Sequence, residues 1–587
     1  MTLRLLPIFA ALVFAPASGQ AEVPLPTPKD HYQHFDTSQA GLKLFTELMG
    51  ELDPATQKLL LEIANSPDAS TLQKIPRSEV LSAVRSVNWQ KWKAPTLEIL
   101  LHHSNVLDVI PAGSKEWVRI VHDALLYFLD RLDSERLLNR LVDFAYLPSG
   151  NSRGDRILQF ASGTPTFQKI GQILARNAGL EPDIQKALQT LENSLRTSTR
   201  QELVEFISGE LGQQTIEKYR IQFADRILAE ASVGAVIRAS LQMPADQERR
   251  DVVCKVIKPY VLKALPEELA ILDELTRYFD QHRAFYELGE IPLAEMFQNI
   301  RKSMSEEIQI EDEQDNLRRA AGYYKDNSRI LIPALYSFST AHVTVMEFVH
   351  GDKISNAFLE NAPQRAIMAR RLSDALTFDV IFSKREEALF HGDPHAGNVF
   401  HVANDSKDPY RIALLDWGLC GLFPRSQRME LVQLMLGIEL NDAKRLQKHL
   451  GGLIEGELPQ SPEKLQRLHQ VIQETLQQRS KRSNFDTLAD LIVRLTKEGY
   501  ALRFNITLFI KSQVTIAGIL TGLDPKLKQD DYLMKRANGL VWKEFHKHLL
   551  NTVWFPGWNS RNYRSMLSNG DITNVVMNRI GGWFGME

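Results

Sequence analysis

The sequence predicts an α+β fold with two lobes and a helical amino-terminal extension. Residues 27–150 and 427–550 place apolar side chains three and four positions apart, which is typical of helices with one buried face. Between these regions, β-branched residues run through 251–257, which is typical of a strand. Short apolar runs flank the polar segment 404–409, which indicates two more strands joined by a turn.

Length and composition set limits on function. At 587 residues, the chain is long enough for roughly three or four domains. Its 44% hydrophobic and 24% charged content is ordinary for a globular protein. The net charge is −3 and no basic run is present, so we expect no nucleic-acid partner.

The pattern with the clearest chemistry is H-x-D-x4-N at residues 391–398, followed by D-W-G at 416–418. It places an aspartate, an asparagine and a second aspartate in the order that holds ATP and its metal in kinase-like folds. Phosphoryl transfer depends mainly on positioning and charge neutralisation. We therefore predict Asp393 as the catalytic carboxylate, and Asn398 and Asp416 as ligands of Mg²⁺, which prefers oxygen.

The segments around this pattern support the prediction. Residues 399–402 and 411–415 are expected to form a hairpin that brings Asn398 and Asp416 to one end of a small sheet. The alternative is a surface turn in which the polar residues are incidental. His391 is interpreted as structural, and His395 as structural or facing the substrate, because imidazole nitrogen suits Zn²⁺ rather than Mg²⁺.

A lysine inside a buried strand requires a partner or a ligand, because an unpaired buried ammonium is very costly. Lys255 lies in the middle of the run 251–257 and is predicted to neutralise the nucleotide phosphates. The alternative is a strand whose Lys255 points to solvent. Lys258 is expected to face the opposite side of the strand, which makes it the poorer candidate.

The alanine-rich stretch 228–238 occupies the position of a loop that covers phosphates. Its predicted binding residues are Ala229, Ala231, Ser232 and Gly234. The stretch has one glycine where such loops usually have three, so we expect it to be stiffer, since alanine lacks the tolerance of glycine for positive φ.

Adenine is expected to bind farther along the chain. Residues 342–351 form an apolar run that ends in a glycine and fits the segment joining two lobes. Backbone groups of about Glu347 to Val349 are the predicted adenine contacts.

Three further motifs make a family resemblance specific. The first is the K-x-G-Q sequence Lys169-Ile-Gly-Gln172, and the second is the alanine-rich stretch. The third, E-x-D followed by E-A-x-N, is represented by residues 307–309 and 313–316. Over roughly residues 155–425 the chain resembles the UbiB-type atypical kinases, a family tied to coenzyme Q biosynthesis. The resemblance implies a protein-kinase-like fold, with ATP and Mg²⁺ as cofactors.

The resemblance also implies roles for the motif residues. Glu313 would pair with Lys255, and Glu307 would contact Lys169. The K-x-G-Q helix would lie over the nucleotide cleft and obstruct protein substrates, which makes Lys169, Gln172 and Glu307 regulatory.

Three departures from the family pattern affect these expectations. Gln309 replaces the aspartate of E-x-D and removes a charge near Lys169 or a metal contact. Glu230 introduces a carboxylate into the loop expected near phosphates, which it would repel unless it turned outward. Many bacterial relatives have a pair of transmembrane segments at the carboxy terminus. The apolar stretches there in this sequence, such as 549–555, are shorter than the ~20 apolar residues that a membrane span requires.

The amino terminus has the arrangement of an export signal. Arg4 precedes the apolar run 5–14, and the small residues of 15–21 could support cleavage. We expect a protein that is exported or tethered to a membrane, on either the periplasmic or the cytoplasmic face. A plain apolar first helix is the alternative.

The segment after Gly418 is short before the next expected helix, which has Ser426 as its predicted cap. A platform for peptide substrates is therefore not expected. The predicted function is an Mg²⁺-dependent ATPase or kinase of the UbiB type that acts on a small molecule or a lipid, with a membrane surface as a possible partner. The alternatives are a phosphotransferase resembling aminoglycoside or choline kinases, and a catalytically silent scaffold that binds nucleotide or lipid.

Six regions are predicted along the chain. They are a signal or anchor (1–21), a helical amino-terminal region (22–150), the K-x-G-Q extension (151–220), the kinase-like small lobe (221–350), the kinase-like large lobe (351–550) and a tail (551–587).

Overall fold

The computed structural model describes residue 47 and residues 49–540 except for short gaps. The gaps are 66–74, 86–88, 111–113, 115, 148–150, 176–179, 194–197, 246–247, 290, 359–360, 404–407, 457, 459–460 and 479–482. The chain divides into two compact units, the first comprising residues 1–310 and 338–345 and the second residues 311–337 and 346–587. The predicted signal (1–21) and tail (551–587) lie outside the described residues, and the six-region division stays a prediction.

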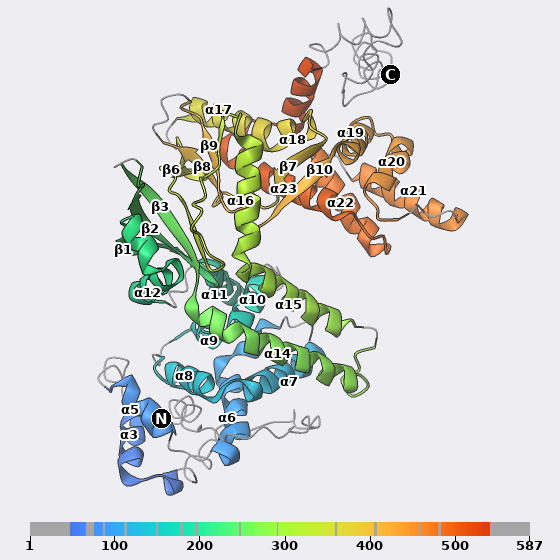
Figure 1. The fold of residues 1–587 in the computed structure, drawn as a ribbon. Helices are drawn as coiled ribbons and strands as arrows, with labels where there is room; N and C mark the ends of the chain where they lie inside the picture. The colour runs from blue at the N-terminus through green and yellow to red at the C-terminus, as the bar shows by residue number, and fades with distance from the viewer. Residues whose placement is uncertain are drawn as a thin grey trace, which may run out of the picture. The chain divides into compact units, whose positions relative to one another are not determined.

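The first unit begins with helices, as predicted (Figure 1). Their bounds are α3 Pro54–Asn65, α5 Arg77–Arg85, α6 Trp89–Ser104, α7 Glu116–Arg131, α8 Ser134–Ala145, α9 Arg153–Ala161, α10 Pro165–Ala175, α11 Pro182–Asn193, α12 Arg200–Leu211 and α13 Gln213–Lys218, with a short 3₁₀ helix η1 at Val106–Val109. Ser152 and Thr199 cap α9 and α12 by accepting from backbone N–H groups of the first turn. An apolar core joins α3 and α5–α11 to α14 (Pro259–Gln281), so these helices form a packed bundle.

A four-stranded sheet completes the first unit (Figure 1). Its strands are β1 Gln222–Glu230, β2 Gly234–Gln242, β3 Arg249–Ile257 and β5 Val343–Glu347, in the order β1-β2-β3-β5. The helices α14 and α15 (Leu293–Ile308) follow β3. The chain passes from the first unit to the second within β5, the segment predicted to join two lobes.

The second unit combines small sheets with many helices (Figure 1). Its helices are α16 Ile310–Tyr324, α17 Ala362–Ser373, α18 Asp379–Ile381, α19 Arg425–Glu439, α20 Ala443–His449, α21 Pro462–Gln477, α22 Asn484–Lys497 and α23 Phe504–Leu523. Short helical segments are η2 Ile354–Asn356, the π-helix η3 Asp374–Phe378 and η4 Leu450–Gly452. Its strands are β4 Ile330–Leu331, β6 Gly351–Lys353, β7 Glu387–His391, β8 Val399–Val402, β9 Ile412–Leu414 and β10 Cys420–Pro424.

The strand pairing of the second unit confirms the predicted hairpin. β8 and β9 pair antiparallel, with Val399 opposite Leu414, in a sheet of order β4-β9-β8-β6. β10 pairs with β7 in a separate two-stranded sheet. Because β10 keeps the chain extended as far as Pro424, α19 starts at Arg425 with Pro424 as its cap, and the predicted cap at Ser426 is wrong.

Among the described helices, α23 alone has the length and hydropathy needed to cross a membrane. Half of its apolar window is buried inside the protein. Its buried Gln513 donates to the carbonyl of Leu376 (3.3 Å) and accepts from the hydroxyl of Thr377 (2.5 Å). These contacts, together with its share in two apolar cores, are typical of a core helix.

Candidate active site

The H-x-D-x4-N segment begins where β7 ends at His391. The N–H of Gly392 donates to the carbonyl of Leu419 (2.8 Å), which continues the pairing of β7 with β10. A Cβ at position 392 would lie 2.9 Å from the Leu419 side chain and 3.1 Å from that of Leu508. This close packing requires glycine where H-R-D motifs have arginine.

A tight turn fixes Asp393 and Asn398 relative to each other. The N–H of His395 donates to the carbonyl of Asp393 (2.9 Å), and the N–H of Asn398 donates to the carbonyl of His395 (2.8 Å). The side-chain Nδ2 of Asn398 also donates to the Asp393 carbonyl (3.1 Å). Within the described part of the chain, the Asn398 Oδ1 and the Asp393 carboxylate accept no hydrogen bond, which leaves these oxygens available to a ligand.

The β8–β9 hairpin brings Asn398 and Asp416 together, as predicted. The N–H of Leu415 donates to the carbonyl of Asn398 (2.8 Å). Asp416 has a φ of 56°, a left-handed conformation that costs a non-glycine residue energy and is common at functional sites. Its exposed carboxylate accepts from the N–H of Gly418 (3.3 Å).

His391 is structural, as the sequence interpretation had it. Its Nδ1 accepts from the N–H of Asp393 (3.2 Å), so Nε2 carries the proton that is donated to the carbonyl of Leu415 (2.9 Å). Burial lowers the pKa of His391 and keeps the imidazole neutral. The imidazole therefore ties the start of the motif to the residue before Asp416.

Trp417 is a residue whose importance the sequence reasoning missed. It is fully buried, its ring lies 4.9 Å from that of His391, and its Nε1–H donates to the carbonyl of Leu414 (3.2 Å). Asn316 of the E-A-x-N motif donates to the Trp417 carbonyl (3.1 Å). The apolar residue at the centre of D-W-G was the available signal, since a buried ring there anchors Asp416.

Lys255 lies in the first unit, on β3 opposite Val236 of β2, and is half-buried. Lys258 is fully buried and follows β3 as the N-cap of α14, so it lies outside the strand. Glu230 is not turned outward to solvent: its side chain is 7% exposed, and its carboxylate pairs with the Lys258 ammonium (2.9 Å), which offsets its charge.

The predicted phosphate loop is shorter than the sequence suggested. Ala229 belongs to β1 and Gly234 opens β2, so only residues 231–233 form the turn. The turn is closed by a hydrogen bond from the Ala231 N–H to the Gly234 carbonyl (2.8 Å). In the described part of the chain, the backbone N–H groups of Ser232 and Val233 have no hydrogen-bond partner, which leaves them available to an anion.

Some hydrogen-bonding groups of the segment predicted to bind adenine are already used within the protein. The Glu347 N–H donates to the carbonyl of Ala334 (2.8 Å), and the Glu347 carboxylate accepts from the Ala334 N–H (3.2 Å). That N–H of Glu347 is therefore not available to a ligand. The N–H of Val349 has no partner among the described residues and is the better candidate.

The contact implied for the K-x-G-Q helix is present. α10 carries Lys169, whose ammonium pairs with the carboxylate of Glu307 at the end of α15. Gln309 ends α15 as its C-cap, and Gln172 lies half-buried on α10. The regulatory role of these residues stays a prediction.

Glu313 lies on α16 and is buried in the second unit, whereas Lys255 belongs to the first. Their predicted pairing, like the convergence of Lys255 with Asp393, Asn398 and Asp416, stays a prediction.

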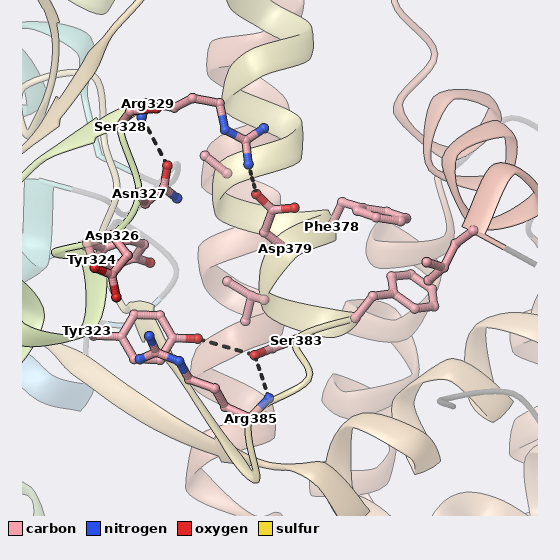
Figure 2. Close-up of a pocket in the computed structure, with 14 residues that line it drawn as sticks. Tyr323, Tyr324, Asp326, Asn327, Ser328, Arg329, Phe378, Asp379, Ser383 and Arg385 are labelled. Carbon is pink, nitrogen blue, oxygen red and sulfur yellow. Dashed lines mark hydrogen bonds and ion pairs between the residues drawn. The ribbon is translucent and has the colours of Figure 1, made fainter. Parts of the chain in front are cut away.

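A pocket of about 570 Å³ lies elsewhere in the second unit, where residues 323–329 face η3 and α18 (Figure 2). Across it, Arg329 pairs with Asp379 (2.6 Å), and the Arg385 guanidinium lies 4.1 Å from the ring centroid of Tyr323 (Figure 2). None of the predicted site residues lines this pocket, so it is separate from the candidate active site.

Comparison with known families agrees with this arrangement. Residues 190–450, which include β1–β10 and the whole D-W-G segment, match the family model described as the ABC1 atypical kinase-like domain. The chain carries an ABC1 atypical kinase-like domain. This match confirms the resemblance to UbiB-type kinases, and the structure confirms an α+β fold with a helical amino-terminal extension.

Relatives of this ABC1 domain are distant. The "Probable protein kinase UbiB" of Haemophilus ducreyi is 25% identical over 286 residues, which are 48% of this chain and 51% of that protein. The "AarF domain-containing protein kinase 1" of Gallus gallus is 29% identical over 297 residues, which are 50% of this chain and 54% of that protein. The chain thus spans about half the length of these curated relatives.

A solved structure titled as the Rv3197–erythromycin complex from Mycobacterium tuberculosis also matches. The sequence identity is 20%, the TM-score is 0.40, and the match covers 60% of this chain and 87% of that chain.

Proposed function

We propose that this ABC1 domain binds Mg²⁺-ATP and either hydrolyses it or transfers its terminal phosphoryl group to a small molecule or a lipid. The observation that carries the proposal is the end of the β8–β9 hairpin. There, one hydrogen-bonded turn links Asp393 to Asn398 and one hairpin links Asn398 to the residue before Asp416, while the Asp393 carboxylate and the Asn398 Oδ1 accept no hydrogen bond from the described residues. Membership of a kinase-like family implies nucleotide binding and supports the proposal.

The residues are suited to Mg²⁺ in particular. The carboxylate of Asp416 and the amide oxygen of Asn398 are hard oxygen ligands, whereas His391 uses both of its nitrogens in hydrogen bonds. When bound, Mg²⁺ would neutralise charge on the phosphate oxygens.

The other predicted site residues would act on the acceptor and on the phosphates. Asp393, with its carboxylate unoccupied by local hydrogen bonds, would orient or deprotonate the acceptor hydroxyl or water. Lys255 would neutralise phosphate charge, and the N–H groups of Ser232 and Val233 would donate to phosphate oxygens. Glu313 would orient Lys255.

The acceptor class rests on the short connection after the D-W-G segment. β10 begins at Cys420 and α19 at Arg425, so the chain has no room there for a long activation segment. A docking surface for a peptide is therefore not expected, and a small-molecule, lipid or quinone-related acceptor is favoured. We also propose export or membrane tethering through residues 1–21, because their sequence has the layout of a signal.

The test is ATP turnover by purified protein with Mg²⁺, compared with an Asp393→Asn variant. Loss of a general base should lower turnover by about 10²–10⁴-fold while leaving ATP binding largely intact. Equal turnover in the two proteins would contradict an enzymatic role. ATP binding without turnover in the wild type would favour the scaffold alternative, and turnover stimulated by amino sugars or choline would favour the phosphotransferase alternative.

A further inference from the structure

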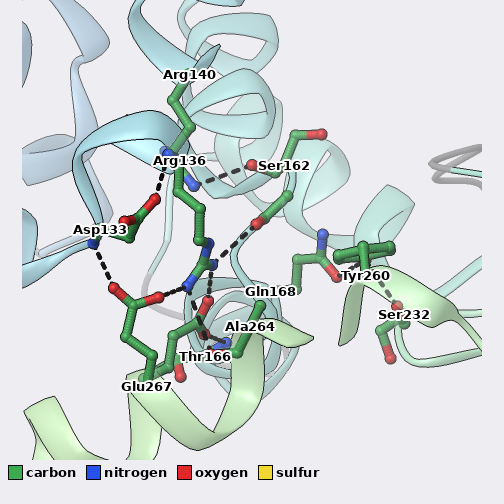
Figure 3. Close-up of polar contacts among 12 residues, drawn as sticks. Asp133, Arg136, Arg140, Ser162, Thr166, Gln168, Ser232, Tyr260, Ala264 and Glu267 are labelled. Atoms are coloured by element: carbon green, nitrogen blue, oxygen red, sulfur yellow. Dashed lines mark hydrogen bonds and ion pairs between the residues drawn. The ribbon is translucent and has the colours of Figure 1, made fainter. Parts of the chain in front are cut away.

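The turn 231–233 is tied to the junction between β3 and α14. The carbonyl of Val233 accepts from the backbone N–H of Lys258 (2.9 Å). The carbonyl of Ser232 lies 3.2 Å from the hydroxyl of Tyr260 (Figure 3). At the turn's entrance, the Glu230 carboxylate pairs with the Lys258 ammonium (2.9 Å). One short stretch of chain, residues 258–260, therefore holds the whole turn.

The ion pair is unusually well shielded. The Lys258 side chain is 0% exposed and that of Glu230 is 7% exposed. The Glu230 Oε1 also accepts from the backbone N–H of Ser198 (3.3 Å), just before α12. Removing one partner of such a pair leaves a buried charge and is strongly destabilising, so each residue keeps the other in place.

The same junction reaches the K-x-G-Q helix. The Tyr260 hydroxyl lies 3.5 Å from the Oε1 of Gln168, a fully buried residue of α10 (Figure 3). α10 is itself seated on α14, because the Thr166 N–H donates to Glu268 (2.8 Å), which also pairs with Arg136 of α8. These contacts link the turn to the packed helices of the first unit, which fix its position.

A rigid position of the turn 231–233 matters because the turn carries backbone N–H groups that can donate to an anion. The Ser232 and Val233 N–H groups have no hydrogen-bond partner in the described part of the chain. Donors that are already oriented lose less entropy when an anion binds than donors on a mobile loop. Protein-kinase loops use three glycines at this position, whereas this chain uses alanine and an ion pair at the turn's entrance.

We propose that Glu230 and Lys258 are positioning residues for nucleotide binding, whose ion pair fixes the turn 231–233 with its free N–H groups directed at the phosphates. This inference rests on the proposed function, because it assumes that the turn meets a nucleotide. Glu230 itself does not touch the phosphates but acts through Lys258.

The test replaces both charges at once, in a Glu230→Gln, Lys258→Met double variant. Substituting both partners avoids leaving an unpaired buried charge, so the fold should be retained. A Glu230→Asp variant provides a second, milder change, since it keeps the charge and shortens the side chain by one methylene. The matched control is an Arg238→Met, Asp251→Asn variant, which removes an ion pair of similar length (2.7 Å) between β2 and β3 whose side chains are 43% and 33% exposed.

Two quantities are measured on each protein: the Kd for Mg²⁺-ATP, and amide hydrogen exchange of residues 229–235 without nucleotide. In the double variant, the Kd should rise about tenfold, equivalent to about 1.4 kcal/mol. Exchange of the turn amides should accelerate by at least about tenfold, as expected for a locally released segment. Glu230→Asp should show a smaller rise in Kd, and the surface-pair control should match the wild type.

The outcomes separate the two proposals. A double variant with the wild-type Kd overturns the inference, whether or not its turn exchanges faster. A wild type that does not bind Mg²⁺-ATP overturns the proposed function instead, and in that case unchanged exchange in the double variant would show independently that the ion pair does not hold the turn.

Discussion

The segment 391–418 and the turn 231–233 hold their proposed phosphate-handling groups by different forces. In the first, neutral hydrogen bonds from His391, Asn398 and backbone groups fix the aspartates, and the contributing residues are close in sequence. In the second, a shielded ion pair holds the turn, and its partners, Glu230 and Lys258, are separated by two strands. The difference teaches that one chain can fix one polar segment by local neutral hydrogen bonds and another by an ion pair between residues far apart in sequence.

The largest effect on stability is expected from replacing Trp417, the buried ring in the segment 391–418. Trp417→Ala should lower the free energy of unfolding of the second unit by about 3–5 kcal/mol, because it removes a fully buried ring from a packed core. Trp417→Phe should cost less, since it keeps a ring and loses chiefly the hydrogen bond to Leu414. Urea denaturation followed by circular dichroism measures both.

Met429→Ala is a suitable control for this experiment, because Met429 is 41% exposed. It should change the free energy of unfolding by no more than about 0.5 kcal/mol. A Trp417→Ala variant as stable as this control would show that the ring does not anchor the segment.

A smaller effect is expected on the pH dependence of stability, which should differ between two histidines, one in each unit. Burial lowers the pKa of His391, so the unfolded chain takes up a proton near pH 6.5 while the native imidazole stays neutral. Stability from this group is therefore present above pH 6.5 and is lost as the pH falls below it. A His391→Asn variant should show a weaker loss of stability between pH 7 and pH 5.

His122 on α7 should behave in the opposite way. Burial alone would lower its pKa, but hydrogen bonds to Asp123 (3.0 Å) and Glu98 (2.9 Å) outweigh burial and raise the pKa to about 9. Its contribution is fully present below pH 6.5 and is lost as the pH rises through about 9. Unfolding midpoints at pH 5, 7 and 9.5 for wild type, His391→Asn and His122→Asn test the direction of the pH dependence for each histidine. The same pH profile of stability in all three proteins would contradict the pKa shifts assigned to both.

The same contrast explains what could be predicted from sequence. The hairpin that joins Asn398 to Asp416 was predictable, because its strands and turn lie within one short stretch with strong local signals. The Glu230–Lys258 pair was not, because sequence spacing indicated only that Lys258 faced away from Lys255 and that Glu230 had to turn from the phosphates. The use of the Glu347 N–H by Ala334 was also hidden, since it depends on a non-local bridge between residues 335 and 346. The cap at Ser426 was wrong because pairing of β10 with β7 extends the strand to Pro424.

The most direct test of the central claim is calorimetric titration of ATP, with and without Mg²⁺, into the wild type and an Asp416→Asn variant. If Asn398 and Asp416 hold a metal that bridges to the phosphates, Mg²⁺ should tighten ATP binding to the wild type. The variant should bind Mg²⁺-ATP at least about tenfold more weakly, a loss of about 1.4 kcal/mol, and should gain little from the metal. Equal affinities in the two proteins, with the same gain from Mg²⁺, would contradict the assignment of the metal site to this end of the hairpin.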